Sequence, residues 1–126
     1  MPLRAKAQQL LQLHQGPRAL LLPNVWDVAS ARLIEDAGFL ALATSSAAIA
    51  NSLGYPDGQR IGRTNMLEAV GRIVEAVRVP VTADLEAGYA RTLPEMKDTA
   101  QELLESGAVG LNLSSKFLSN NSLGVA

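Results

Sequence analysis

Two acidic residues directly after an apolar segment are the side chains of this sequence that are best suited to chemistry. Asp84 and Glu86 follow residues 79–83, which read Val-Pro-Val-Thr-Ala, and one residue separates the two carboxylates. If the chain stays extended here, both carboxylates point to the same side. Two carboxylates on one side suit a hard cation such as Mg²⁺, which takes oxygen ligands and often keeps several waters. Two solvated loop charges or a helix cap would produce the same spacing.

Hydroxyl groups follow an earlier apolar segment, residues 39–43. Ser45 and Ser46 offer hydroxyls and backbone amides that could bind a carboxylate, although an ordinary turn also favours serine. Further along, residues 54–58 read Gly-Tyr-Pro-Asp-Gly and include Asp57, in a composition that is typical of turns. The spacing of these residues by itself therefore leaves the function open.

Helical and strand patterns alternate along the chain and indicate which elements would position these side chains. Apolar spacing and caps predict helices at residues 2–15, between Asp27 and Gly38, at residues 64–77, and from Thr92 to Ser106. Apolar runs predict strands at residues 19–22, 39–43, 79–83 and 108–113. The connection from residue 44 to about residue 63 is long, and loops beyond about 12–15 residues are usually functional or disordered.

Four predicted strands that alternate with four predicted helices, with strands apolar on both faces, predict an α/β fold with a parallel sheet. An open doubly wound sheet and part of a (β/α)₈ barrel, or TIM barrel, both have this pattern. A complete barrel needs about 250 residues, so 126 residues have room for about four βα units, or half a barrel. We expect residues 1–113 to form this half-barrel and residues 114–126, rich in serine and asparagine, to form an irregular tail.

In parallel α/β folds, ligands bind at the carboxyl ends of the strands. The two serines, the 54–58 segment and the acidic pair all follow predicted strands, so we expect them to be neighbours in space. A small receiver-like binding module is a weaker alternative, because it would need an acidic cluster beside the first strand. Asn24 and Asp27 do not supply such a cluster.

Composition and charge exclude several classes of partner. The 11 basic and 12 acidic residues give a net charge of −1 and form no basic face, so we expect no nucleic-acid partner. The apolar stretches are too short to cross a bilayer, and we expect neither a membrane span nor a signal peptide. The chain has no cysteine, which excludes disulfides and thiolate metal sites and fits a cytoplasmic protein.

Taken in order, several motifs of this chain resemble the isocitrate lyase/phosphoenolpyruvate mutase superfamily. They are Pro-Asn-Val-Trp-Asp at residues 23–27, Ala-Thr-Ser-Ser-Ala at 43–47, Ser-Leu-Gly-Tyr-Pro-Asp-Gly at 52–58 and Pro-Val-Thr-Ala-Asp-Leu-Glu-Ala-Gly-Tyr at 80–89. The resemblance runs from about residue 20 to residue 113, and its last two motifs are the most specific. The form Asp-Leu-Glu-Ala-Gly-Tyr is similar to that of the phosphonomutase-like branch.

The resemblance implies a (β/α)₈ barrel enzyme, a lyase or mutase that binds Mg²⁺ and a small 2-oxo or phosphono carboxylic acid. Such enzymes make or break a C–C or P–C bond through an enolate-like intermediate. By position, Asp84 corresponds to the principal metal carboxylate and Glu86 to a second acidic residue that reaches the metal through water. Ser45 and Ser46 correspond to residues that hold the substrate, and Asp57 corresponds to a catalytic loop aspartate near metal and substrate.

The sequence departs from the family pattern after its fourth predicted strand. The family usually continues Asn-Leu with Glu-Asp, whereas Asn112 and Leu113 are followed here by two serines. The Lys-Lys-Cys loop of the lyases and the Arg and His ligands of the second half of the barrel are also absent from this sequence. An alternative hypothesis is therefore a truncated, catalytically inactive half-barrel, and its open edge strands predict a homo-oligomer.

Overall fold

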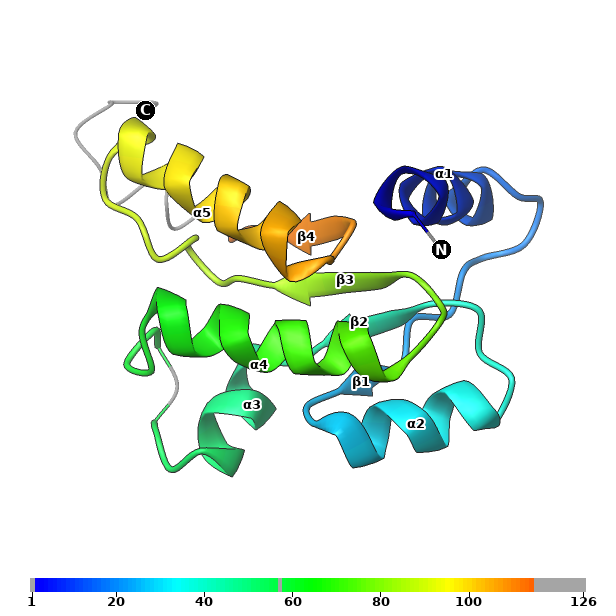
Figure 1. Cartoon of the computed structure of the whole chain (residues 1–126), viewed down its shortest axis with the longest axis horizontal. Coiled ribbons are helices and arrows are strands. Elements are labelled where there is room, and N and C mark those ends of the chain that lie inside the picture. Colours follow the sequence, from blue (N-terminus) through cyan, green and yellow to red (C-terminus); the bar gives the residue numbers. More distant parts are fainter. Residues whose placement is uncertain (1, 57, 115–126) are drawn as a thin grey trace.

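Helices and parallel strands alternate along the computed structural model, which describes residues 2–56 and 58–114 (Figure 1). The helices of this part are α1 (Leu3–His14), α2 (Val28–Asp36), α3 (Ser46–Ser52), α4 (Arg63–Ala76) and α5 (Leu93–Ser106). The strands are β1 (Asn24–Val25), β2 (Leu42–Thr44), β3 (Val81–Asp84) and β4 (Gly110–Asn112). Asp57 and residues 115–126 of the predicted tail lie outside the described residues. Within the described ranges, no helix is both long enough and apolar enough to span a membrane.

The strands form one parallel sheet in the order β1-β2-β3-β4, so each strand lies beside the strand that precedes it in the sequence. An open doubly wound sheet reverses its strand order at a switch point. A (β/α)₈ barrel instead adds its strands in one direction around the barrel. The observed order therefore agrees with the barrel alternative and confirms the predicted α/β fold with part of a (β/α)₈ barrel.

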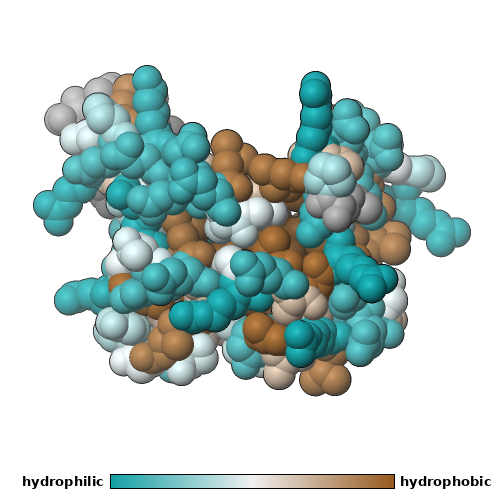
Figure 2. All heavy atoms as spheres, in the orientation of Figure 1, coloured by the Kyte–Doolittle hydropathy of each residue, from teal (hydrophilic) through white to brown (hydrophobic). Residues whose placement is uncertain are grey.

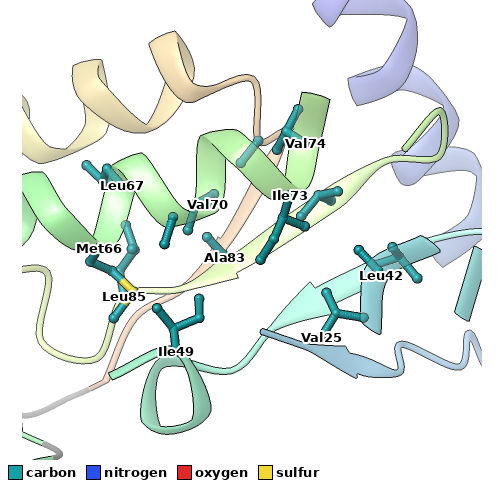
Figure 3. Packing of buried hydrophobic residues seen from close by; sticks show 14 of the residues in the cluster. Val25, Leu42, Ile49, Met66, Leu67, Val70, Ile73, Val74, Ala83 and Leu85 are labelled. Atoms are coloured by element: carbon teal, nitrogen blue, oxygen red, sulfur yellow. The ribbon is translucent and has the colours of Figure 1, made fainter. Parts of the chain in front are cut away.

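The main apolar core lies between the sheet and α4, which contacts both α2 and α5. Met66, Val70 and Ile73 follow each other at helical spacing and are fully buried on α4 (Figure 3). They belong to the same buried cluster as the strand residues Leu42 and Ala83. Because each large apolar side chain stabilises a fold by about 1.5–3 kcal/mol when buried, α4 holds the middle of the sheet in place.

The face of the sheet opposite α4 carries the side chain of Asp84. Ala83 belongs to the core cluster, and because side chains alternate along a strand, its neighbours Thr82 and Asp84 point to the opposite face. Helix α1 reaches this face near Gly110, which is the register partner of Thr82. A Cβ atom at Gly110 would lie 2.8 Å from Thr82 Oγ1 and 3.1 Å from Leu10 Cδ2. Only a residue without a side chain therefore fits between α1 and this part of the sheet.

Side-chain caps explain why the predicted starts of α2 and α5 agree with the structure to within one residue. Asp27 begins α2 by accepting the Ser30 amide at 2.7 Å, while the Ser30 hydroxyl accepts the Asp27 amide at 3.2 Å. Thr92 begins α5 by accepting the Glu95 amide at 3.3 Å. The Glu95 carboxylate accepts the amide of Arg91, at 2.6 Å, in place of the Thr92 amide that a full capping box would use. Caps of this kind contribute about 1 kcal/mol each.

The first two predicted strands were wrong in their bounds. Residues 19–22 form no strand, because pairing with β2 begins only at the Pro23 carbonyl, which accepts the Ala43 amide at 3.0 Å. Leu20 and Leu21 of this run are partly or largely exposed, and together with Phe39 and the end of α1 they line an apolar cavity of about 390 Å³. Strand β2 likewise begins at Leu42, three residues later than predicted. An apolar run becomes a strand only where a partner strand lies beside it.

The long connection after β2 contains a helix that the sequence analysis missed. Helix α3 follows its N-cap Ser45 and buries Ile49 and Ala50, and it contacts α4. Its seven residues are too few to display a helical period, and its flanking serines were interpreted as turn formers. Since α3 begins where β2 ends, it lies at the edge of the sheet that carries Asp84 (Figure 1).

Candidate functional site

Asp84 is the last residue of β3, and hydrogen bonds from neighbouring segments fix its position. Its Oδ2 accepts a hydrogen bond of 2.8 Å from the Ser46 hydroxyl, and its Oδ1 accepts one of 3.0 Å from the Glu86 amide. The Asp84 amide itself donates to the Thr44 hydroxyl at 3.2 Å. These contacts join the ends of β2 and β3, so the sheet and α3 determine where the carboxylate lies.

The two serines at the end of β2 have different contacts. The Ser45 hydroxyl caps α3 by accepting the Ala48 amide at 3.3 Å, and the Ser45 amide donates to the Val25 carbonyl at 3.0 Å. Ser46 is 3% exposed, and its hydroxyl donates its single proton to Asp84. Both serines thus lie at the strand end that the sequence indicated, but the Ser46 hydroxyl is already engaged with an acidic residue of the site.

Glu86 lies in a turn, so the chain does not stay extended from Asp84 through Glu86, and the condition for both carboxylates to point to one side is not met. The backbone of Glu86 is left-handed, with a φ of 52°, and the turn continues to Tyr89, which has a φ of 54°. Leu85 still continues the strand, because its amide donates to the Asn112 carbonyl at 3.1 Å and its buried side chain joins the core cluster as that of Ala83 does. Gly88 then closes the turn by donating its amide to the Leu85 carbonyl at 2.7 Å. The Asp84 carboxylate therefore comes from the end of a strand, whereas the Glu86 carboxylate comes from the turn that follows it.

Contacts from distant parts of the chain hold this turn after β3. The Tyr89 hydroxyl donates to Glu86 Oε2 at 2.9 Å, and the Tyr89 amide donates to Gln59 Oε1 at 2.9 Å. The buried Thr99 hydroxyl of α5 donates to the Gly88 carbonyl at 2.7 Å. The sequence analysis missed Gln59 and Thr99 because no local pattern connects them to the turn. The only signal was that Tyr89 ends the motif at residues 80–89.

Asn112 on β4 is a further residue that the sequence analysis did not select and that the register places beside Asp84. Register partners of a sheet share one face, so the amide side chain of Asn112 belongs to the same end of the sheet. Where the family pattern has an acidic pair, Ser114 donates its amide to the Glu86 carbonyl. The described part of the chain after β4 therefore supports the turn through its backbone and adds no carboxylate.

Several surface cavities of the described residues include three whose walls do not contain Asp84. Besides the one next to α1, a cavity of about 330 Å³ lies between α2, α3 and α4. Another, of about 430 Å³, is lined by residues that include Gln59, Arg63, Tyr89 and Arg91. The third borders the turn after β3 through Tyr89, whereas Asp84 lines none of the three. The partly exposed Asp84 carboxylate instead lies on the sheet face opposite α4.

The donor set at this edge fits a hard cation that keeps much of its own water. Among the described residues, no three His, Asp or Glu side chains are grouped so that they could hold a metal ion. Asp84 and Glu86 offer two carboxylates, and a carboxylate has about four lone-pair sites, of which Asp84 uses two for the contacts above. Mg²⁺ is commonly held by one or two carboxylates, with waters and substrate completing its shell. The residues present therefore fit Mg²⁺ better than a metal that requires a closed protein cage.

Comparison with known proteins shows which family this chain resembles in sequence. The family model described as phosphoenolpyruvate phosphomutase matches residues 10–123. An oxaloacetate decarboxylase of Bradyrhizobium diazoefficiens is 34% identical over 119 residues, which are 94% of this chain and 41% of that protein. A 2-methylisocitrate lyase of Aeropyrum pernix is 31% identical over 117 residues, which are 93% of this chain and 38% of that protein.

The fold of a solved structure agrees with these matches. A crystal structure from Burkholderia cenocepacia, of a protein assigned as a phosphonomutase, superposes with a TM-score of 0.83 at 42% sequence identity. The superposition covers 86% of this chain and 44% of that protein. The chain thus spans about two fifths of the length of the curated relatives it matches.

Proposed function

The chain belongs to the phosphoenolpyruvate phosphomutase family, and on this basis we propose that it is the metal-binding part of a lyase or mutase. The substrate that we propose is a small 2-oxo or phosphono carboxylic acid, whose C–C or P–C bond is made or broken through an enolate-like intermediate. The names of the relatives support this class, since they include an oxaloacetate decarboxylase, a 2-methylisocitrate lyase and a phosphonomutase. The proposed location is the cytoplasm.

Asp84 and Glu86 are the residues that we propose to hold Mg²⁺, with Asp84 as the principal ligand and Glu86 acting through water. The observation that carries this proposal is the fixed position of Asp84 at the carboxyl end of β3, with one oxygen bonded to the Ser46 hydroxyl and the other to the Glu86 amide. Ligands in parallel barrel folds bind at this end of the strands. When bound, Mg²⁺ would supply positive charge that stabilises negative charge developing on a substrate oxygen.

Ser45 and Ser46 are the residues that we propose to hold the substrate carboxylate. Support comes from their place at the end of β2, directly beside Asp84. Because the Ser46 hydroxyl donates its single proton to Asp84 and orients that carboxylate, we propose that Ser46 would donate to the substrate carboxylate through its backbone amide at the start of α3. Asp57, which lies outside the described residues, keeps its proposed catalytic role near metal and substrate.

Calorimetric titration of the purified chain with Mg²⁺, with and without oxalate as an enolate mimic, tests this proposal. We expect binding that strengthens when oxalate is present, and no detectable binding in Asp84→Ala. The matched control is Asp36→Ala, which removes an exposed carboxylate at the end of α2 and should keep wild-type affinity. Unchanged Mg²⁺ affinity in Asp84→Ala would sink the site assignment.

A second candidate is a catalytically inactive half-barrel that folds and self-associates, and two features of the surface favour self-association. Strands β1 and β4 are the edges of the described sheet, and unpaired edges are templates for pairing with another chain. Leu111 on β4 and Leu113 after it are 42% and 43% exposed. Figure 2 shows hydrophobic atoms gathered in the middle of one face, between the more hydrophilic surfaces of α5 and α1. We therefore propose a homo-oligomer, and an absence of Mg²⁺ binding by the wild type would favour this second candidate.

A further inference from the structure

We propose that Tyr89 is a positioning residue for the Glu86 carboxylate, and that Gln59 fixes Tyr89 from a separate loop. This inference rests on the proposed function, in which Glu86 takes part in binding a divalent cation. It adds two residues to which neither the motifs nor the names of the relatives assign a role. Its evidence is a chain of contacts that runs from the Gln59 side chain through the Tyr89 backbone and hydroxyl to Glu86.

The contact between Tyr89 and Glu86 fixes one carboxylate oxygen in space. The phenol hydroxyl donates to Glu86 Oε2 at 2.9 Å, across a turn in which the two residues are three positions apart. A glutamate side chain has several rotatable bonds, so a carboxylate that must meet a cation loses more conformational entropy if nothing orients it beforehand. A neutral hydroxyl donor orients it without adding a competing positive charge.

The turn itself needs support, because its backbone is unfavourable for the residues that form it. Glu86 and Tyr89 both have left-handed backbone conformations, with φ of 52° and 54°. A non-glycine residue in this region costs on the order of 1 kcal/mol or more, and such conformations persist only where the surroundings hold them. The position of the Tyr89 hydroxyl therefore depends on whatever fixes the Tyr89 backbone.

Gln59 is the side chain that fixes the Tyr89 backbone. Its Oε1 accepts the Tyr89 amide at 2.9 Å, from 30 positions earlier in the sequence. Gln59 also has a left-handed backbone, with a φ of 67°, which is uncommon for glutamine. The Tyr89 ring packs against the core cluster. The backbone of Tyr89 is therefore held by Gln59 and its ring by apolar contacts, and together these fix the position of the hydroxyl. Gln59 thereby connects the loop after α3 to the turn that carries Glu86.

The removal of a group that orients a metal ligand typically weakens metal affinity by about 10–100-fold. Tyr89→Phe keeps the ring and its packing but removes the hydroxyl, so we expect Mg²⁺ affinity to fall by about tenfold or more. Gln59→Leu removes the acceptor for the Tyr89 amide and should weaken affinity in the same direction. Gln59→Glu keeps an acceptor oxygen at this position, so it should retain most of the wild-type Mg²⁺ affinity that Gln59→Leu loses. Tyr55→Phe is the matched control, since Tyr55 is the other tyrosine of the chain, and it should leave affinity unchanged.

The experiment combines Mg²⁺ titration calorimetry on these variants with thermal unfolding of the metal-free proteins. Without metal, the losses in melting temperature of Tyr89→Phe and Glu86→Leu should not add in the double variant, because each removes one partner of the same hydrogen bond. Wild-type Mg²⁺ affinity in Tyr89→Phe, while Asp84→Ala abolishes binding, overturns this inference and leaves the proposed function intact. An absence of Mg²⁺ binding in the wild type overturns both. Full additivity of the two melting losses also counts against the positioning contact.

Discussion

Replacement of Gly107 by alanine tests how tightly α4 and α5 pack behind the site. Gly107 ends α5 with a left-handed φ of 91°, just before the chain enters β4. A Cβ atom at this position would lie 2.8 Å from Val74 Cγ1, and Val74 is a buried core residue of α4. Carbon atoms in contact are normally about 3.5–4.0 Å apart, so the new methyl group would overlap the valine by roughly 0.7 Å or more.

Two terms contribute to the expected loss of stability. The left-handed conformation costs an alanine about 1–2 kcal/mol relative to glycine. Overpacking of a filled core by one methyl group typically costs another ~1–3 kcal/mol. We therefore expect Gly107→Ala to lower the free energy of unfolding by about 2–5 kcal/mol, a large part of the about 5–15 kcal/mol available to a typical domain.

Gly38→Ala separates the two terms. Gly38 follows α2 with a similar φ of 99°, but no atom would lie within 4 Å of its new Cβ atom. It should cost only the conformational part, about 1–2 kcal/mol. Both variants are unfolded in urea at one fixed protein concentration, and the transition is followed by circular dichroism. Suppose that Gly107→Ala lowers the free energy of unfolding by no more than Gly38→Ala does. Val74 would then accommodate the new methyl group at no cost, and the argument for close packing of α4 against α5 would be refuted.

Two further predictions concern the support of the turn and the assembly. Thr99→Val keeps the volume of a side chain that is 2% exposed but removes the hydroxyl that donates to the Gly88 carbonyl. We therefore expect the free energy of unfolding to fall by about 1–3 kcal/mol. Thr64→Val, at an exposed position of α4, should change stability by no more than about 0.5 kcal/mol. In light scattering, the wild-type chain should have a multiple of its monomer mass, because β1 and β4 leave open edges. A monodisperse monomer with a cooperative thermal transition would contradict the proposed self-association.

The sequence was most informative where structure depends on neighbouring residues. The caps at Asp27 and Thr92 and the apolar period of α4 determined three helices almost to their observed bounds. The sequence was least informative for short elements. Helix α3 has seven residues and β1 has two, so neither displays a period. The bounds of β1 depend on hydrogen bonds to β2 and could not be found from the apolar run at residues 19–22.

At the candidate site, local sequence and tertiary structure contributed different parts. The motifs predicted the family and placed Asp84 at the end of a strand, because an apolar strand followed by acidic residues is a local pattern. Tertiary structure decided the rest: Ser46 donates to Asp84 across 38 positions, and Gln59 accepts from Tyr89 across 30. The turn that begins at Glu86 is likewise held by distant residues, since Gln59 accepts the Tyr89 amide and Thr99 donates to the Gly88 carbonyl. Contacts between distant residues depend on how the elements pack, and no local pattern encodes them.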